Sequence, residues 1–102
     1  MNEDHAAESP KVFTLHQNAP NPFNPATSIP FSLAGSGTVR LVVHDALGRK
    51  VRTLLNEPLP AGTHTIRWDG RDGSGRMVSS GVYICRMRAG AFEKSIKMTF
   101  MR

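Results

Sequence analysis

The side chains best suited to catalysis are a single cysteine, Cys85, and three histidines in strand-like segments, His16, His44 and His64. The cysteine falls on the apolar side of an alternating segment, so we expect a small buried hydrophobic side chain rather than a nucleophile. The histidines lie on separate segments without the spacing of metal ligands. Neither a nucleophile elbow nor a pair of catalytic carboxylates is present. The sequence therefore predicts a protein that is not an enzyme and needs no cofactor.

A glycine-rich loop after Trp68 offers oxygen ligands for a cation. Asp69 and Asp72 are weak candidates for binding Ca²⁺, because their spacing is not that of an EF-hand loop, where ligands occupy alternate positions. Aspartate also caps its own turn by accepting backbone hydrogen bonds. Turn capping is therefore the default interpretation of this loop, and no metal site is assigned to it.

The chain is basic, with 13 Lys and Arg against 8 Asp and Glu, a formal charge of +5. Many of the basic residues occupy the positions that alternate with apolar ones and should therefore face outward: Arg40, Lys50, Arg52, Arg67, Arg86, Arg88 and Lys97. Such a face can be a solvated surface that prevents edge-to-edge association, or a surface that attracts an anionic partner. Nucleic acid is disfavoured as that partner, since no binding motif and no interleaved aromatic residues accompany the charge.

The elements that must position these residues are strands, because apolar residues recur with a period of two. Val39, Leu41 and Val43 alternate with other residues in this way, and no window of 11 residues shows a helical stripe. We expect about seven strands, near residues 11–16, 27–34, 37–45, 49–55, 62–69, 81–89 and 92–101. Short strands separated by Gly and Pro turns are typical of an all-β, antiparallel β-sandwich.

Several residues have expected structural roles in this sandwich. Pro58, Pro60 and Gly62 should close off the strand-like run from Val51 to Leu55, and Trp68 should anchor the core. Gly81 should let the backbone pass close to a neighbour, and Tyr83 should place its ring inside with its hydroxyl at the rim. Phe13 is expected in the core as well.

With 102 residues the chain is expected to form one domain, which buries roughly 65% of its unfolded surface. Residues 1–10 lack large apolar side chains, which predicts a disordered polar linker or an expression tail ahead of a domain at 11–102. We expect no signal peptide and no transmembrane segment, because the start is acidic and no apolar run approaches about 20 residues.

Three ordered stretches are more specific than composition: Leu15 to Pro25, Val43 to Val51, and Trp68 to Asp72 followed by Gly81 to Tyr83. Together they resemble the C-terminal sorting domains of type IX (Por) secretion substrates from Bacteroidetes-like bacteria. They are also similar to the related Ig-like domain of the flagellar hook-capping protein. The resemblance implies an Ig-like sandwich with recognition residues at Gly81, Tyr83, Lys94 and Lys97. Its structural motif residues fall on Asn21, Pro22, Phe23, Asn24, Pro25, Gly48 and Trp68.

The resemblance implies a non-catalytic domain that directs secretion of a larger protein and anchors it at the cell surface. Its expected partners are the outer-membrane type IX machinery, surface lipopolysaccharide and an upstream cargo domain. Its expected route is through the periplasm to the cell surface or the extracellular space. Two alternatives stay open. One is an Ig-like module that binds carbohydrate or cell wall beside a secreted enzyme, although we expect the aromatic residues that it needs to lie in the core. The other is an assembly domain like the hook-capping one.

Overall fold

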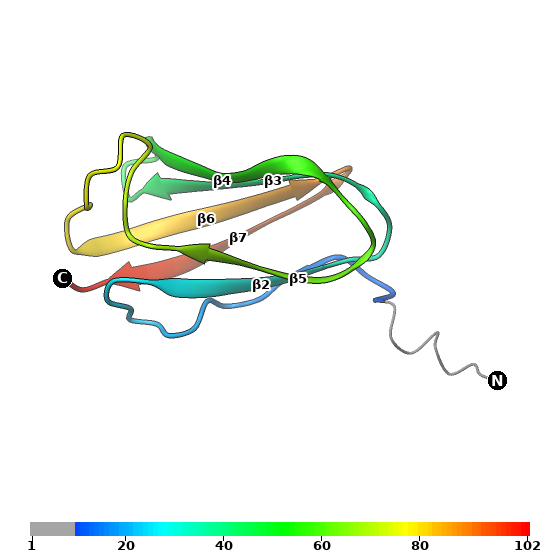
Figure 1. The fold of residues 1–102 in the computed structure, drawn as a ribbon, viewed down its shortest axis with the longest axis horizontal. Coiled ribbons are helices and arrows are strands. Elements are labelled where there is room, and N and C mark those ends of the chain that lie inside the picture. The colour runs from blue at the N-terminus through cyan, green and yellow to red at the C-terminus, as the bar shows by residue number, and fades with distance from the viewer. Residues whose placement is uncertain (1–9) are drawn as a thin grey trace.

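The computed structural model describes residues 10–102 and contains seven strands in two antiparallel sheets (Figure 1). One sheet has the order β1 (Thr14–Leu15), β2 (Thr27–Leu33), β5 (Gly62–Trp68). The other has the order β4 (Lys50–Leu59), β3 (Gly37–Asp45), β6 (Gly81–Ala89), β7 (Phe92–Phe100). This confirms the predicted all-β sandwich. The expected linker at 1–10 lies outside the described residues, apart from Pro10.

The core forms where alternate side chains of the two sheets meet, as the period of two requires. Strand β6 shows the pattern most clearly, because Tyr83, Cys85 and Met87 are buried while Arg86 and Arg88 are exposed. The largest fully buried side chains come from both sheets and from the segment before β2: Trp68, Phe23, Phe31, Phe100, Leu15, Ile29, Leu33, Leu41, Met87, Met98, Val39 and Val43. The sandwich therefore has one continuous apolar interior.

Two strand boundaries differ from the prediction. Strand β1 contains only Thr14 and Leu15 instead of residues 11–16. Strand β4 continues beyond Leu55 and through Pro58 to Leu59, so the expected end at residue 55, before Pro58, is wrong. Because β4 is an edge strand, a proline there can leave its missing N–H on the open side of the sheet without breaking a ladder. The described part of the chain contains no helix long and apolar enough to span a membrane.

Candidate functional site

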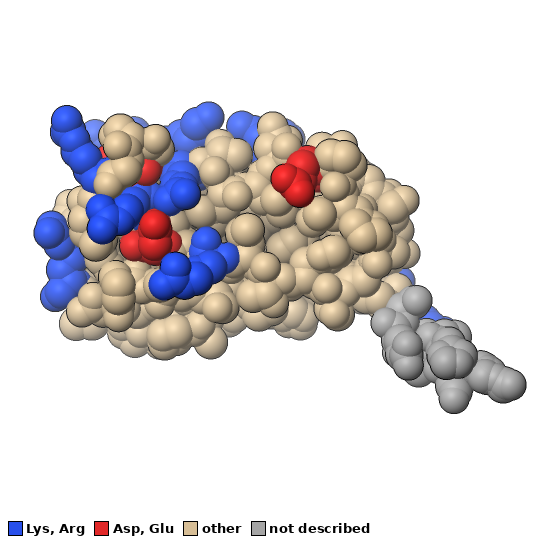
Figure 2. Space-filling view, in the orientation of Figure 1, with Lys and Arg blue, Asp and Glu red and all other residues tan. Residues whose placement is uncertain are grey.

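Segments of all three motif stretches gather at one end of the sandwich, beside the C-terminus (Figure 1), although the first stretch begins on β1, where Leu15 lies opposite Phe31. We call this region the motif end and define it by residues 18–26, the β3–β4 turn at 45–49, the loop 69–80 and the last residues of β7. Figure 2 shows Lys and Arg side chains concentrated at the same end. Within these residues the charged side chains are Arg49, Arg71 and Arg76 against Asp45, Asp69 and Asp72, and further basic residues flank them at Lys50, Arg52 and Arg102.

Phe23 fixes the proline-rich segment to the core of the motif end. Its ring is 2% exposed and lies 5.4 Å from the ring centre of Trp68 and 5.1 Å from that of Phe100. Its backbone N–H donates to the Thr99 carbonyl at 3.0 Å, and its carbonyl accepts from Met101 N–H. The segment thus lies along the outer edge of β7 and covers an edge that would otherwise be open.

Asparagine side chains hold this segment in ways that the sequence did not predict. Asn21 accepts a hydrogen bond from the Thr99 backbone N–H at 2.9 Å. Asn18 is 3% exposed and donates both to the Thr27 hydroxyl at 2.9 Å and to the Pro20 carbonyl at 3.1 Å. Buried polar groups need such partners, so asparagines within a proline-rich crossing are a signal that could have indicated these bonds.

Gly70 is the glycine at which two backbones approach closely. Its φ is +77°, and a Cβ there would lie 2.9 Å from the Pro25 carbonyl oxygen and 3.3 Å from the Phe100 ring. Gly81, where we expected the close approach, has open space around its Cβ position. That expectation is wrong: Gly81 is suited to its place because its φ is +154°.

Asp69 caps the turn after Trp68. Its Oδ1 accepts from the Arg71 backbone N–H at 3.1 Å and from Arg52 Nη1 at 3.0 Å. The Trp68 indole N–H donates to the Arg71 carbonyl at 2.9 Å, so ring and turn hold each other in place. The Asp69 carboxylate therefore makes its bonds to protein donors.

Asp72 caps the next turn of the loop. Its Oδ1 accepts from the backbone N–H groups of Ser74 and Arg76 and from the Ser74 hydroxyl, at 2.9 to 3.0 Å. The Arg76 N–H, followed by the Ser74 hydroxyl, holds the pKa of Asp72 below its ordinary value. Turn capping, the default interpretation, is confirmed for both aspartates. Residues 10–102 contain no cluster of three His, Cys, Asp or Glu side chains able to hold a metal.

The β3–β4 turn presents an aliphatic side chain at the tip of the motif end. Asp45 Oδ1 accepts from the backbone N–H groups of Leu47 and Arg49 at 2.9 Å, and Asp45 Oδ2 pairs with Arg49 Nε at 2.8 Å. Gly48 completes the turn with a φ of +86°. This arrangement leaves the Leu47 side chain 78% exposed.

Tyr83 lies as predicted, with its ring inside and its hydroxyl at the rim. The residue is 7% exposed, and its ring meets Trp68 edge-on at 5.4 Å between centres. Its hydroxyl donates to the Ser79 carbonyl at 2.7 Å, which ties the end of the loop to β6. Burial raises the pKa of Tyr83. A tyrosine whose hydroxyl bonds to the backbone a few residues upstream is a recurrent structural feature of β-sandwiches.

The basic residues do not share one face, contrary to the parity argument. Arg40, Arg86 and Arg88 lie on the outer face of the four-stranded sheet, whereas Arg67 lies on the outer side of β5 in the other sheet. Register shifts in the β3–β4 pairing place Arg52 opposite the buried Val43, and it bonds to Asp69 between the sheets. The alternation along a strand shows on which side of that strand a residue lies. It does not show to which sheet the strand belongs, or where a β-bulge reverses the alternation.

Lys94 and Lys97 lie on opposite sides of β7, because an odd spacing reverses the direction of a strand side chain. Lys97 shares the outer side with Arg86, while Lys94 shares the side of Ile96 and is exposed. The Lys97 carbonyl accepts a hydrogen bond from Gln17 Nε2 at 2.7 Å. The two lysines therefore form no single patch.

Cys85 and the histidines have structural surroundings. Cys85 is fully buried, and burial raises the pKa of its thiol to about 12. The thiol is consequently protonated at neutral pH and shielded from solvent, as expected of a core side chain. His64 stacks on Phe31 at 5.4 Å and bonds to the Pro60 carbonyl, while His16 bonds to Thr14.

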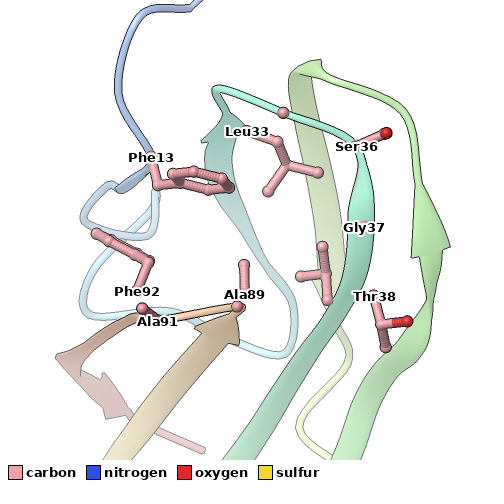
Figure 3. Close-up of a pocket in the computed structure, with 11 residues that line it drawn as sticks. Phe13, Leu33, Ser36, Gly37, Thr38, Ala89, Ala91 and Phe92 are labelled. Carbon is pink, nitrogen blue, oxygen red and sulfur yellow. The ribbon is translucent and has the colours of Figure 1, made fainter.

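A groove of about 590 Å³ opens at the end of the sandwich opposite the motif end (Figure 3). Phe13 and Phe92 stack at 5.7 Å on one side of it, and the β2–β3 and β6–β7 turns complete its walls. Phe13 packs against the core as expected, but it is only half-buried, because one side of it faces the groove. Since Trp68 and Tyr83 are buried, these two rings are the main aromatic surface available to a ligand.

Comparison with known proteins agrees with this architecture. The family described as FlgD Ig-like domain matches residues 24–91. FlgD from P. aeruginosa shares 25% identity at a TM-score of 0.58 over 72% of this chain and 57% of its own. No curated protein matches the chain.

Two proteins of Porphyromonas gingivalis share the fold at lower identity. Latent dimeric PorU is 19% identical at a TM-score of 0.66, over 91% of this chain and 10% of PorU. PorZ, described as an essential surface component of the type IX secretion system, is 20% identical at 0.59, over 86% of this chain and 11% of PorZ. The chain thus corresponds to a small part of each, and the fold is an Ig-like sandwich.

Proposed function

Because this chain belongs to the FlgD Ig-like domain family, we propose that it is a non-catalytic module that other proteins recognise as a folded surface. More specifically, we propose that it directs secretion of a larger protein through the type IX system and anchors it at the cell surface. Its partners would be the outer-membrane type IX machinery, surface lipopolysaccharide and a cargo domain in the same polypeptide. It would pass through the periplasm to the cell surface or the extracellular space.

The observation that supports this proposal is the assembly of all the motif stretches into one end of the fold. Asn21 bonds to Thr99, which lies 78 positions away in the chain. Gly70 packs against Pro25, and Arg52 reaches Asp69. A partner that read this end would contact segments brought together only by folding, so it would distinguish folded from unfolded chains.

The placement of the first described residues and the C-terminus at opposite ends of the sandwich also suits a sorting role. Phe13, near the first described residues, packs on Phe92 at the groove end, while the C-terminus lies at the motif end (Figure 1). A cargo joined before residue 10 would therefore leave the motif end free. The presence of this fold in PorU and PorZ supports the type IX branch, since PorZ is a component of that system.

A second candidate function is an assembly domain like that of FlgD. It is favoured by the family match over residues 24–91 and by the 25% identity with FlgD. The same motif end would then bind another subunit of an extracellular assembly rather than a secretion machine. The carbohydrate-binding alternative has only the half-buried Phe13 and Phe92 to support it.

A surface-display assay tests the sorting role. The domain is fused behind a periplasmic reporter and expressed in a bacterium that has a type IX system, and reporter is measured on intact cells. We expect surface reporter with the native domain and a severalfold loss with Leu47→Ser, because this side chain is 78% exposed at the tip of the motif end. Val12→Ser is the matched control, since Val12 is 62% exposed beside the groove end.

Circular dichroism of each variant confirms that the domain is folded. Reporter that stays in the periplasm although the native domain is folded would contradict the sorting role and favour the assembly role. Equal display by Leu47→Ser and Val12→Ser would refute recognition through the tip of the motif end.

A further inference from the structure

A small hollow on the outer face of the four-stranded sheet collects positive charge from three strands. Its volume is about 80 Å³, and we call it the arginine hollow. Its lining residues are Arg40, Val42, His44, Lys50, Arg86 and Arg88. Strands β3, β4 and β6 hold these side chains in fixed register, so the hollow is built on rigid elements rather than on a loop.

The register of the arginine hollow places like charges face to face. Arg40 lies directly opposite Arg88, and Arg86 lies one outward row further along the same pair of strands. Like charges at directly opposite positions destabilise a sheet. A mixture of acidic and basic side chains would keep this face soluble without placing like charges opposite each other. The arrangement therefore points to a role other than solvation.

Acidic residues only partly balance this charge. Glu93 Oε2 lies 3.2 Å from Arg86 Nε, and Glu93 Oε1 lies 3.7 Å from Arg88 Nε. Within residues 10–102, neither Arg40 nor Lys50 has a carboxylate in ion-pair distance. Four cationic side chains therefore face one carboxylate, which leaves an excess that an anion would neutralise.

The chemistry of the lining fits phosphate. Guanidinium groups bind phosphate oxygens through paired, parallel hydrogen bonds, and several of them around one hollow suit an anion with more than one charge. A volume of about 80 Å³ corresponds to two or three waters at about 30 Å³ each. The hollow therefore has room for one tetrahedral oxyanion, and the rest of a larger ligand would stay outside it.

The surroundings favour a hydrated ligand over a bilayer. The residues opposite Arg40 and Arg86 on the two edge strands are Asn56 and Ser95, which are polar and exposed, while Val42, the apolar residue in the lining, is only 5% exposed. A membrane-binding surface would instead expose apolar side chains beside its cations. We propose that the arginine hollow binds a phosphate group carried on a hydrated ligand, such as a phosphorylated saccharide. Such a ligand would agree with the lipopolysaccharide partner proposed above, but binding of phosphate by the arginine hollow can hold without the sorting role.

Titration of the 102-residue chain with inorganic pyrophosphate in low-salt buffer, followed by calorimetry, tests the proposal. We expect saturable binding, and an affinity at least tenfold weaker with Arg40→Gln or Arg86→Gln. Arg67→Gln is the matched control, because Arg67 is also exposed on an outer sheet face but lies in the other sheet. It should bind pyrophosphate as tightly as the native chain.

A second readout separates a built site from diffuse charge. Arg40→Gln removes the like-charge contact with Arg88, so its denaturation midpoint should rise while its affinity falls, whereas Arg67→Gln should change neither. Absence of pyrophosphate binding, or equal weakening by all three substitutions, would overturn the proposal. Binding to anionic phospholipid vesicles without binding to pyrophosphate would overturn it as well, in favour of a membrane surface.

Discussion

Substitution of Gly70 by alanine tests the close contact that joins the loop to the proline-rich segment. Two penalties are expected. A left-handed backbone costs a residue with a Cβ about 1–2 kcal/mol, partly offset by about 0.4–1 kcal/mol from the stiffer unfolded chain. The new Cβ would also lie 2.9 Å from the Pro25 carbonyl oxygen, which must move. Overpacking of this kind costs about 1–3 kcal/mol.

Gly48→Ala is the matched control for Gly70→Ala. Its φ of +86° is close to the +77° of Gly70, but its Cβ position has no neighbour within 4 Å. Gly48→Ala should therefore lose only about 0.5–1 kcal/mol. Gly70→Ala should lose about 1.5–4 kcal/mol, since it bears the contact penalty as well.

Equilibrium unfolding in urea, analysed by linear extrapolation, measures both free energies of unfolding. A second observable is the chemical shift of Phe23 and Phe100, which should change in Gly70→Ala and not in Gly48→Ala, because Pro25 is two residues from Phe23. If the two variants lost equal stability, the backbone contact at Gly70 would contribute nothing, and the reasoning would fail.

Two further predictions concern titratable groups. The Cys85 thiol, fully buried with its pKa raised to about 12, should react with a thiol reagent only when the chain unfolds; rapid reaction of the native protein at pH 8 would contradict its burial. The lowered pKa of Asp72 implies stability that is fully present above the ordinary value of 3.8 and is lost as the pH falls through the folded-state pKa. Asp72→Asn should thus be less stable than the native chain at pH 7, and unfolding experiments should show this difference shrinking in acid; a difference independent of pH would refute it.

The strands could be predicted from the sequence because period-two alternation depends on the strand itself. Five of the seven strands begin and end within one residue of their expected bounds, and Trp68 is buried as expected. The extension of β4 through Pro58 could not be predicted, because it depends on β4 lying at a sheet edge. Edge and centre positions follow from the order of strands in space, which local patterns do not contain.

The candidate site was less predictable for the same reason. Sequence parity placed Arg52 and Arg67 with Arg86, but one lies between the sheets and the other on the opposite sheet. The close approach at Gly70 depends on Pro25, which is 45 positions away in the chain. Residue types and spacing therefore identified the segments of the motif end, whereas its contacts required the fold.

Burial decides which substitutions can reveal recognition at the motif end. Phe23, Trp68 and Tyr83 are each at most 7% exposed, so they contribute to the motif through packing rather than through contact with a partner. Truncating any of them would disturb the sandwich, since large buried side chains cost about 3–5 kcal/mol on removal. Loss of surface display in Tyr83→Ala would then report an unfolded domain as readily as a lost contact.

Exposed residues of the same end are free of this ambiguity. The motif fixes the backbone of the β3–β4 turn through Asp45 and Gly48, and that turn holds out Leu47. A partner that reads the motif end must touch side chains such as Leu47, whose loss leaves the core intact. Buried residues therefore preserve the shape of the motif end, and under the proposed function the exposed ones would determine what binds to it.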